Sequence, residues 1–271
     1  MTALLKLDHV SKMFVRGGLL SSHRIAAVRD VSFTIAADKA EIVALIGESG
    51  SGKSTLARMI LGIDMPTAGT LELYGRNVAK ASRAERRAFM AMVQPIFQNP
   101  FEAFNPLKKL DRYVFMTAER FGGAAAGEAA QTAAAAALKK VGLSLAEVRG
   151  RYPHELSGGQ LQRVAIARAL VSNPRLIVAD EPVSMVDASL RMAIVNLFGR
   201  LRDEMAISIV YITHDLATAY YISDRIIILQ KGEVVETGDA RSVLAAPRHP
   251  YSRKLRDSVL TADGPRLSAS S

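Results

Sequence analysis

Residues 47–55, with the sequence GESGSGKST, decide the fold class of this chain. They follow the apolar run Glu41–Ile46, which we interpret as a buried strand, and they open a predicted helix over Lys53–Leu61. A loop of the pattern G-x-x-x-x-G-K-S/T between a strand and a helix is typical of sites that bind nucleotide phosphates. The alternative is a glycine-rich turn that only caps a helix, and the flanking strand and helix favour the nucleotide site.

Each residue type in this loop has a physical role. Glycines at Gly50 and Gly52 let the backbone turn, so that successive N–H groups face phosphate oxygens. The following helix adds its positive N-terminal end. Lys53 would place a cation on the β- and γ-phosphates, and the Ser54 hydroxyl would bind Mg²⁺. The predicted nucleotide-binding residues of the loop are Gly47, Glu48, Ser49, Gly50, Ser51, Gly52, Lys53, Ser54 and Thr55.

Two adjacent carboxylates end a second apolar run, Leu176–Ala179. A parallel strand would carry Asp180 and Glu181 to the phosphate loop, because ligands bind at the carboxyl ends of such strands. Asp180 is then the expected Mg²⁺ ligand, through water, and Glu181 the base that orients and deprotonates the attacking water. A solvated turn would also suit two acids, but the phosphate loop favours the catalytic interpretation.

Short apolar runs alternate with helix-like segments along most of the chain, which predicts an α/β P-loop fold with a mostly parallel sheet. The first forty residues contain two strands with no helix between them, so we expect an antiparallel β edge there. The segment Pro106–Arg151 has no convincing strand and includes an alanine-rich run, which predicts an inserted α-helical subdomain. Further strands are expected at Leu4–Val10, Ala27–Ile35, Thr70–Tyr74, Ile207–Ile212, Arg225–Leu229 and Glu233–Glu236, and further helices at Ser82–Met90, Val164–Leu170 and Ala188–Met205.

A third motif, LSGGQ at residues 156–160, precedes an amphipathic helix. Ser157 can serve simply as the N-cap of that helix. Together with the other two motifs, however, LSGGQ makes nearly the whole chain resemble the nucleotide-binding subunit of ATP-binding cassette (ABC) transporters. The resemblance implies ATP and Mg²⁺ as cofactors, and ATP hydrolysis between two cassettes that close head to tail. In that family this signature motif contacts the ATP of the other cassette, which implies nucleotide contacts from Ser157, Gly158, Gly159 and Gln160.

The resemblance implies further roles residue by residue. His214 matches the switch histidine, and Asp187 lies in the loop that contacts the second cassette. Gln98 matches the glutamine that senses Mg²⁺ and faces the membrane subunits; Gln94 is a rival that lacks the following Asn-Pro. Phe14 is the candidate for stacking on adenine, although a core aromatic residue on a strand is the alternative. The implied catalytic residues are Glu181, His214, Lys53 and Gln98, and the implied metal ligands are Ser54, Gln98 and Asp180.

We expect four segments along the chain. Residues 1–99 would form the catalytic core with its antiparallel β part, and residues 100–156 a helical subdomain that ends at the signature motif. Residues 157–238 would form the signature helix and the rest of the core. Residues 239–271 would form a basic C-terminal tail.

Two runs narrow the resemblance to the importers of oligopeptides, dipeptides and nickel. Residues 98–106, QNPFEAFNP, are similar to Q-D-P-x-x-S-L-N-P, and residues 249–255, HPYSRKL, are similar to H-P-Y-T-x-x-L. Phe104 and Leu161 depart from the family pattern, and Phe104 lies in the segment that would meet a membrane subunit. The implied partners are two membrane-spanning permease subunits, a second cassette (as a heterodimer rather than a homodimer) and, indirectly, an extracytoplasmic substrate-binding protein. The implied location is the cytoplasmic face of the inner membrane, and the implied cargo is a peptide or similar small solute.

The amino-acid composition limits which functions and partners are possible. The 271 residues contain no cysteine, which excludes a catalytic thiol or a cysteine-ligated metal within them. The longest stretch without charge, Ala88–Phe101, is too short to span a membrane. The net charge of +9 would also suit a soluble ABC ATPase acting on DNA. The basic charge concentrates outside the motifs, in residues 76–90 and 241–271, so we expect no nucleic-acid partner. The same motifs would also suit an exporter subunit, or a cassette that binds ATP without turnover.

Overall fold

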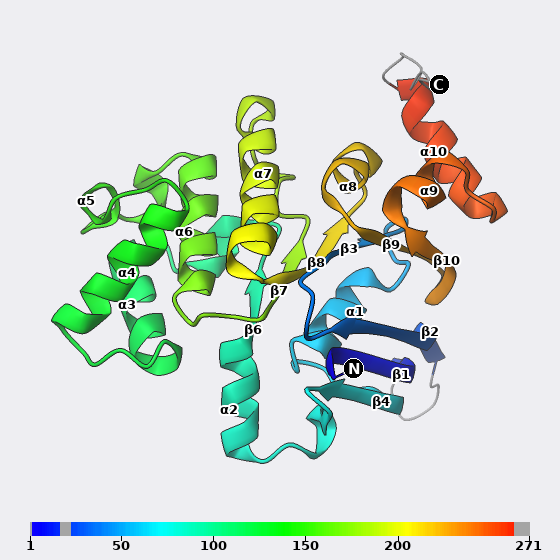
Figure 1. Ribbon diagram of the computed structural model, residues 1–271, viewed down its shortest axis with the longest axis horizontal. Helices are drawn as coiled ribbons and strands as arrows, with labels where there is room; N and C mark the ends of the chain where they lie inside the picture. The colour runs from blue at the N-terminus through cyan, green and yellow to red at the C-terminus, as the bar shows by residue number, and fades with distance from the viewer. Residues whose placement is uncertain (1, 17–22, 263–271) are drawn as a thin grey trace.

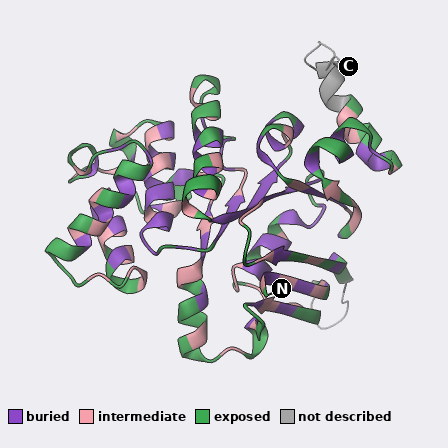
Figure 2. Ribbon diagram, in the orientation of Figure 1, coloured by how far each residue is buried: buried purple, intermediate pink, exposed green. Residues whose placement is uncertain are grey.

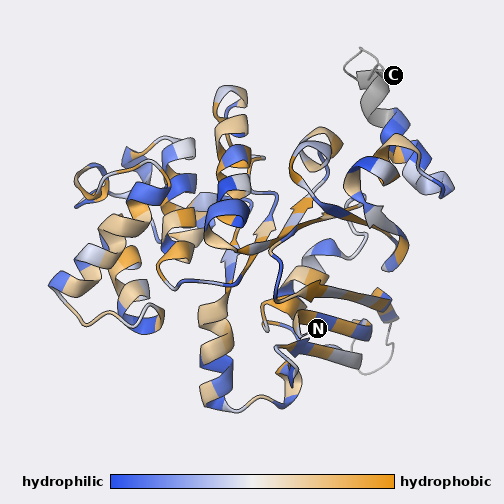
Figure 3. Cartoon of the chain, viewed as in Figure 1, coloured by the Kyte–Doolittle hydropathy of each residue, from blue (hydrophilic) through white to orange (hydrophobic). Residues whose placement is uncertain are grey.

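A six-stranded sheet forms the centre of the computed structural model, which describes residues 2–16 and 23–262 (Figure 1). Its strands are all parallel except β10, which is antiparallel to β9. Their order across the sheet is β10 (Glu233–Asp239), β9 (Arg225–Gln230), β3 (Ile42–Ile46), β8 (Ser208–Thr213), β7 (Leu176–Asp180) and β6 (Val93–Ile96). The central strands are buried and apolar along their length (Figures 2 and 3). This is the pattern that a parallel sheet covered on both faces requires.

The antiparallel strands predicted near the N-terminus are present, and they form a sheet of their own. This four-stranded sheet has the order β2 (His23–Ala36), β1 (Ala3–Arg16), β4 (Ala68–Leu73) and β5 (Arg76–Asn77). Helix α1 (Lys53–Ile60) lies between the two sheets (Figure 1). The phosphate loop that precedes α1 is therefore anchored to both sheets.

Alternate residues of the central strands face two different cores, as the period of two in a strand requires. In β7, Leu176 and Val178 pack in the core between the two sheets, together with Leu56 and Met59 of α1. Ile177 and Ala179 pack on the other side, in the core under helices α6 (Gly158–Leu170) and α7 (Ala188–Met205). The parallel sheet is thus held from both faces.

The segment predicted to be helical contains α3 (Leu110–Phe121), α4 (Glu128–Lys140) and α5 (Leu145–Val148). Helices α3 and α4 pack against α6, α5 packs against α3 and α4, and together they form one end of the molecule (Figure 1). Both departures from the family pattern lie in this part and are buried. The ring of Phe104 makes an edge contact with Tyr113 and lies under the guanidinium of Arg168, and Leu161 is fully buried. Phe104 therefore packs inside the chain instead of facing a partner.

Strand β6 was not predicted, because its sequence Val-Gln-Pro-Ile contains a proline in the middle. Proline lacks the N–H that a central strand needs. A proline is tolerated here because β6 is an edge strand, the last of the sheet, and pairs only with β7. Pro95 can therefore leave its nitrogen on the unpaired side.

The segment predicted as a basic tail contains two helices in the residues that the structure describes. Residues 240–262 form α9 (Ala240–Ala245) and α10 (Pro250–Ala262), and residues 263–271 lie outside the described part. Tyr251 and Leu244 pack with Ala44 and Ile46 of β3 and with α8 (Leu216–Ile222). The remaining helix, α2 (Arg83–Met92), is capped by Ser82, the first residue of the helix predicted over Ser82–Met90. None of the helices described is long and apolar enough to span a membrane.

Candidate functional site

Four loops that carry predicted site residues begin at the carboxyl ends of four neighbouring parallel strands. The strand order β3-β8-β7-β6 places the phosphate loop after β3 and His214 after β8. Asp180 and Glu181 end β7, and Gln98 follows β6. The sheet topology thus gathers residues that lie more than one hundred positions apart in the sequence.

The phosphate loop is closed around the side chain of Lys53, which is only 8% exposed. The ammonium Nζ donates to the carbonyl oxygens of Gly47, at 2.6 Å, and Glu48, at 2.9 Å. Gly52 has a φ of 106°, and a Cβ there would lie 2.4 Å from the carbonyl oxygen of Ala27. Only glycine fits this position, because both the conformation and the close approach exclude a side chain.

The turn between β9 and β10 ties the phosphate loop to the antiparallel sheet. Its two residues, Lys231 and Gly232, both have positive φ, as a two-residue hairpin turn requires. The N–H of Gly232 donates to the carbonyl oxygen of Ser51 at 2.9 Å. The carbonyl oxygen of Gly232 accepts from the N–H of Arg29 in β2 at 2.8 Å. One turn residue therefore bridges the loop and β2.

Opposing electrostatic effects act on Lys53 and Asp180. The pKa of Lys53 is lowered, mainly by burial; the nearby carboxylates of Glu181 and Asp180 oppose part of this shift. Burial also raises the pKa of Asp180, and a hydrogen bond with the Ser54 hydroxyl partly counters that rise. An anion beside Lys53 and a cation beside Asp180 would each relieve the cost of burying these charges.

Ser54 and Asp180 fit a magnesium ion that arrives with phosphates. Mg²⁺ prefers oxygen ligands and usually takes one or two from the protein, with phosphate and water supplying the others. The Ser54 hydroxyl and the Asp180 carboxylate are such oxygens, and Ser54 lies close enough to lower the pKa of Asp180. Within the described ranges, no cluster of three or more His, Asp or Glu side chains could hold a metal alone. The donor set is therefore that of a shared protein–phosphate site.

The carboxylate of Glu181 is held by one partner on each oxygen. His214 Nδ1 lies 3.0 Å from Oε1, and Gln98 Nε2 donates to Oε2 at 3.1 Å. The side chain of Glu181 keeps 20% of its surface exposed, so water can reach it. The rival Gln94 is buried in β6, where its amide donates to the carbonyl of Met90. The structure thus brings Gln98, and not Gln94, to Glu181.

The backbone of Glu181 is strained as well as fixed. Its φ of 44° lies in the left-handed region, which costs a residue other than glycine about 1–3 kcal/mol. The N–H of Glu181 donates to Ile212 in β8, and its carbonyl oxygen accepts from both the N–H and the hydroxyl of Ser184. These bonds hold the conformation that aims the carboxylate between His214 and Gln98. A fixed and solvent-accessible carboxylate of this kind can accept a proton from water.

The signature motif forms a second, separate group. Ser157 caps α6: its hydroxyl accepts from the N–H of Gln160 at 3.2 Å, and the Gln160 side chain accepts from the N–H of Ser157 at 3.0 Å. A Cβ on Gly158 would meet the carbonyl oxygen of Met185 at 3.3 Å, and one on Gly159 would meet the Leu190 side chain. Asp187 begins α7 in this neighbourhood without a side-chain capping bond.

These signature residues do not join the first group. Across the described ranges, no hydrogen bond or ion pair links residues 157–160 to the phosphate loop. Phe14 also lies apart, on β1, where it is 38% exposed and the ammonium of Lys12 lies 5.2 Å from the centre of its ring. It is therefore an exposed aromatic ring, not a core residue.

One residue at the site was not predicted from the sequence. The hydroxyl of Tyr251 accepts a hydrogen bond from the N–H of Glu48 in the phosphate loop at 2.9 Å. The run HPYS at residues 249–252 was singled out only through its resemblance to importers. A contact between residues 203 positions apart leaves no local pattern that could reveal it.

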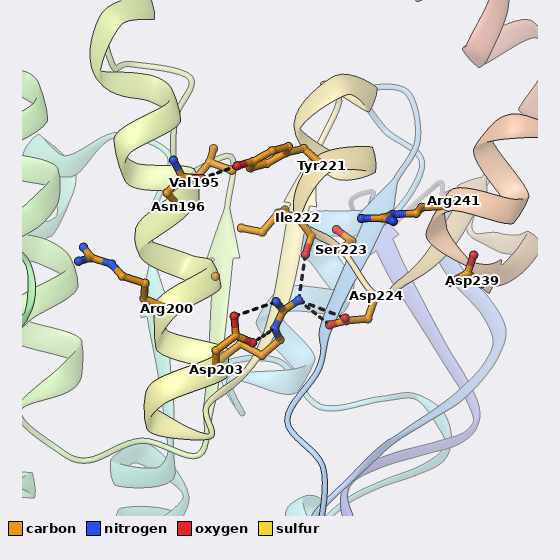
Figure 4. A pocket seen from close by; sticks show the side chains of 12 residues that line it. Val195, Asn196, Arg200, Asp203, Tyr221, Ile222, Ser223, Asp224, Asp239 and Arg241 are labelled. Carbon is orange, nitrogen blue, oxygen red and sulfur yellow. Dashed lines mark hydrogen bonds and ion pairs between the residues drawn. The ribbon is translucent and has the colours of Figure 1, made fainter. Parts of the chain in front are cut away.

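A large cavity lies away from both groups (Figure 4). It has a volume of about 710 Å³ and opens between α7, α8 and the start of α9. Arg202 lies in its wall and is paired with Asp203 and Asp224. Asp224 precedes β9, so the cavity lies at the amino ends of the parallel strands, opposite the predicted site. It contains none of the predicted site residues.

Comparison with known sequences gives consistent matches. A family model described as "ABC transporter" matches residues 28–184. The glutathione import ATP-binding protein GsiA of Salmonella paratyphi A is 39% identical over 95% of this chain, and the chain spans 41% of GsiA. The probable peptide ABC transporter ATP-binding protein y4tS of Sinorhizobium fredii is 38% identical, over 93% of this chain and 71% of that protein. The oligopeptide transport ATP-binding protein OppF of Haemophilus influenzae is 37% identical, over 90% and 72%.

Solved structures agree with the fold. The ATP-binding cassette MJ0796, described as a dimer in a post-hydrolysis state bound to ADP and Pi, has a TM-score of 0.76 and 32% identity. The match covers 88% of this chain and 99% of that one. CbiO1 of Clostridium perfringens has a TM-score of 0.77 at 23% identity, over 97% and 96% of the two chains, which supports the fold alone.

Proposed function

The chain belongs to the ABC transporter family, and from that premise we propose that it is the ATP-hydrolysing subunit of an ABC importer. The observation that carries the proposal is the carboxylate of Glu181, held between His214 and Gln98 beside the phosphate loop. A metabolic or regulatory nucleotide site would need the loop but not this arrangement. A base fixed on both oxygens suits the activation of water for attack on a phosphate.

Catalysis in this proposal is mainly positioning and electrostatics. Lys53 turns its ammonium from the loop carbonyls toward the β- and γ-phosphates, and backbone N–H groups of the loop bind their oxygens. Ser54 and Asp180 would hold Mg²⁺, which would neutralise charge on the phosphates. Glu181 accepts the proton of the attacking water, while His214 and Gln98 keep its carboxylate aligned. Gln98 would also reach the metal when the nucleotide is bound.

A complete site would require two cassettes. Within the part of the chain that the structure describes, the signature residues Ser157–Gln160 share no hydrogen bond with the phosphate loop, so they can serve a nucleotide on a second cassette. The solved cassette MJ0796, similar over 88% of this chain, is a dimer bound to ADP and Pi. Asp187 would contact the second cassette, and Phe14 would stack on adenine. A heterodimer with a related subunit is the arrangement we propose.

The proposed location is the cytoplasmic face of the inner membrane, on two permease subunits that work with an extracytoplasmic binding protein. The name of GsiA, an import protein, supports uptake over export, and the names of y4tS and OppF, which are peptide transport proteins, support a peptide cargo. Phe101 and Leu107, 48% and 84% exposed, follow Gln98 and offer an apolar surface to a permease. A peptide or a similar small solute is the proposed cargo.

ATP hydrolysis by the purified chain, alone and with its permease partners, tests the activity. We expect Glu181→Gln to bind ATP as the wild type does and to hydrolyse it at least about 100-fold more slowly, because general-base catalysis contributes that much. Glu204→Gln, on the exposed end of α7, is the matched control and should keep the wild-type rate. Wild-type turnover by Glu181→Gln would exclude Glu181 as the base.

Transport assays in a deletion strain test the direction. Loss of the gene should reduce uptake of labelled peptides, and the wild-type gene, but not the Glu181→Gln gene, should restore it. Impaired efflux with normal uptake would instead identify an exporter.

A further inference from the structure

A single peptide unit at the start of the phosphate loop is held on both of its polar groups. The carbonyl oxygen of Gly47 accepts from the ammonium of Lys53 at 2.6 Å. The N–H of Glu48 belongs to the same peptide plane and donates to the hydroxyl of Tyr251 at 2.9 Å. The orientation of this plane sets the direction in which the loop leaves β3, so these two contacts fix how the loop begins.

Tyr251 is itself firmly placed. Its side chain is 6% exposed and packs with Ala44 and Ile46 of β3, the strand that leads into the loop. Its own N–H donates to the ring Nδ1 of His249 at 3.2 Å. A buried aromatic ring against the same strand has little freedom to move its hydroxyl away from Glu48.

The segment before Tyr251 is anchored to the sheet. The carboxylate of Glu236 in β10 accepts from the N–H of Arg248 at 2.8 Å and from the N–H of His249 at 3.1 Å. Hydrogen bonds from N–H groups to a carboxylate are stronger than those between neutral groups. The chain is therefore tied to β10 immediately before it presents Tyr251 to the loop.

The two contacts on the peptide unit differ in what happens when a nucleotide binds. In the proposed function, Lys53 directs its ammonium to the phosphates, which weakens its hold on the carbonyl of Gly47. The hydroxyl of Tyr251 carries no part of the phosphate contact and keeps its bond to Glu48. It is the contact that remains to hold the loop when Lys53 is shared with the ligand.

We propose that Tyr251 is a positioning residue for the phosphate-binding loop: its hydroxyl fixes the Gly47–Glu48 peptide and so keeps the loop in the shape that receives nucleotide phosphates. The inference rests on the proposed function, because it concerns the same nucleotide site. It assigns to the HPYS run a role inside this chain, with α10 acting on the loop through one hydrogen bond.

The surroundings of the contact set the size of the expected effect. A cavity of about 320 Å³, lined in part by Glu48, Gln230 and Lys254, adjoins Tyr251. In Tyr251→Phe a water molecule can enter this polar space and partly replace the lost partner. Loss of one ordinary hydrogen bond then gives about a fivefold change in an equilibrium constant. The loop should loosen without collapsing.

Nucleotide titration of the full chain tests the proposal. We expect Tyr251→Phe to raise the Kd for ADP and for ATP about fivefold, with Mg²⁺ present, and to raise the KM for ATP similarly. The kcat at saturating ATP should stay within twofold, since the catalytic groups are unchanged. Amide hydrogen exchange in residues 47–52 of the free protein should be faster than in the wild type. The melting temperature should stay close to that of the wild type, because phenylalanine keeps the packed ring.

Tyr221→Phe is the matched control. It removes a hydroxyl that donates to Asn196 near the cavity of Figure 4, far from the loop, and should leave every value unchanged. Wild-type affinity and wild-type exchange in Tyr251→Phe would overturn the positioning role while leaving the proposed function intact. A wild-type chain that binds neither nucleotide would overturn the proposed function and this inference together.

Discussion

Lys53 is the residue whose environment changes most between the free protein and the proposed complex. Its ammonium is buried and donates to loop carbonyl oxygens, and in the complex it must also contact phosphates. Burial lowers the pKa of this ammonium. The glycine-rich loop around it could be predicted from the sequence, because the pattern is local and each residue type has a physical reason. Its burial and its carbonyl partners could not, because they depend on the folded loop.

Replacing Lys53 with alanine should remove the main cationic contact with the phosphates. We expect the affinity for ATP to fall at least about tenfold and turnover to be lost, since a charge-assisted hydrogen bond contributes about 1.5–3 kcal/mol. Calorimetric titration measures the affinity. Lys39→Ala, at an exposed position before β3, should bind ATP normally. Unchanged affinity and turnover in Lys53→Ala would contradict the site.

The lowered pKa of Lys53 also predicts a pH dependence. Only the charged ammonium attracts phosphate, and its pKa in the free protein lies below the ordinary value of 10.5. The affinity for ADP should therefore be constant near neutral pH and should fall as the pH rises through the pKa of Lys53, below pH 10.5. Titrations from pH 7 to 11 measure this. Lys53→Ala should show no such fall over the range, and a wild-type affinity that stays flat through pH 10.5 would refute the prediction.

The N-termini of the helices differ in the charge of their capping residues, and this difference bears on ligand binding. Helices α2 and α5 begin with capping boxes closed by Glu85 and Glu147, whereas α6 closes its box with the neutral Gln160. A carboxylate in the first turn compensates the positive end of a helix. The first turn of α6 has no acidic residue, so its positive end remains available to an anion. The signature motif thus caps its helix without neutralising it.

Gln160→Glu tests this difference directly. Glutamate preserves the capping box but adds a negative charge where a phosphate would approach, so we expect turnover to fall at least tenfold while the melting temperature stays near that of the wild type. ATP binding to the separate chain should be retained. The reciprocal change Glu147→Gln at α5 is the control and should leave turnover unchanged. Normal turnover in Gln160→Glu would show that α6 does not meet an anion.

Elements with strong local signals were predicted well, and elements that depend on distant partners were not. The strand and the helix that flank the phosphate loop, β3 and α1, and the helix α7 lie close to their predicted bounds. Strand β6 was missed because Pro95 argues against a strand anywhere except at an edge. Helices α9 and α10 were missed because the basic composition of residues 239–271 concealed their buried face, which packs against β3 and β9.

At the scale of the whole molecule, the predicted site is divided. One end of the sheet carries the phosphate loop, Glu181 and His214, while the signature residues lie beside the helical segment and, among the described residues, share no hydrogen bond with that loop. The family resemblance implied this division, because it assigns the signature motif to the ATP of the other cassette. In this chain α6, which carries the motif, packs against α3 and α4. A chain whose two halves lie apart in this way suits a pair of cassettes arranged head to tail.

Glu181→Gln should therefore trap a dimer when ATP is present. Binding without hydrolysis keeps two cassettes closed, so light scattering after size exclusion of the chain mixed with its partner cassette should give the summed mass of the two. ADP in place of ATP should give the separate masses, and so should Glu181→Gln combined with Gln160→Glu. A Glu181→Gln chain that binds ATP and forms no pair would contradict the two-cassette site, and twice the mass of this chain alone would contradict the heterodimer.

The turn at Lys231–Gly232 has a consequence for which nucleotides fit. It joins the phosphate loop, through Ser51, to strand β2, which pairs with the strand that carries Phe14. If the base rests on one sheet and the phosphates on the other, as proposed, this turn fixes the distance between the aromatic ring and the phosphate loop. A nucleotide is then selected by the distance between its base and its phosphates, before any hydrogen bond to the edge of the base is made.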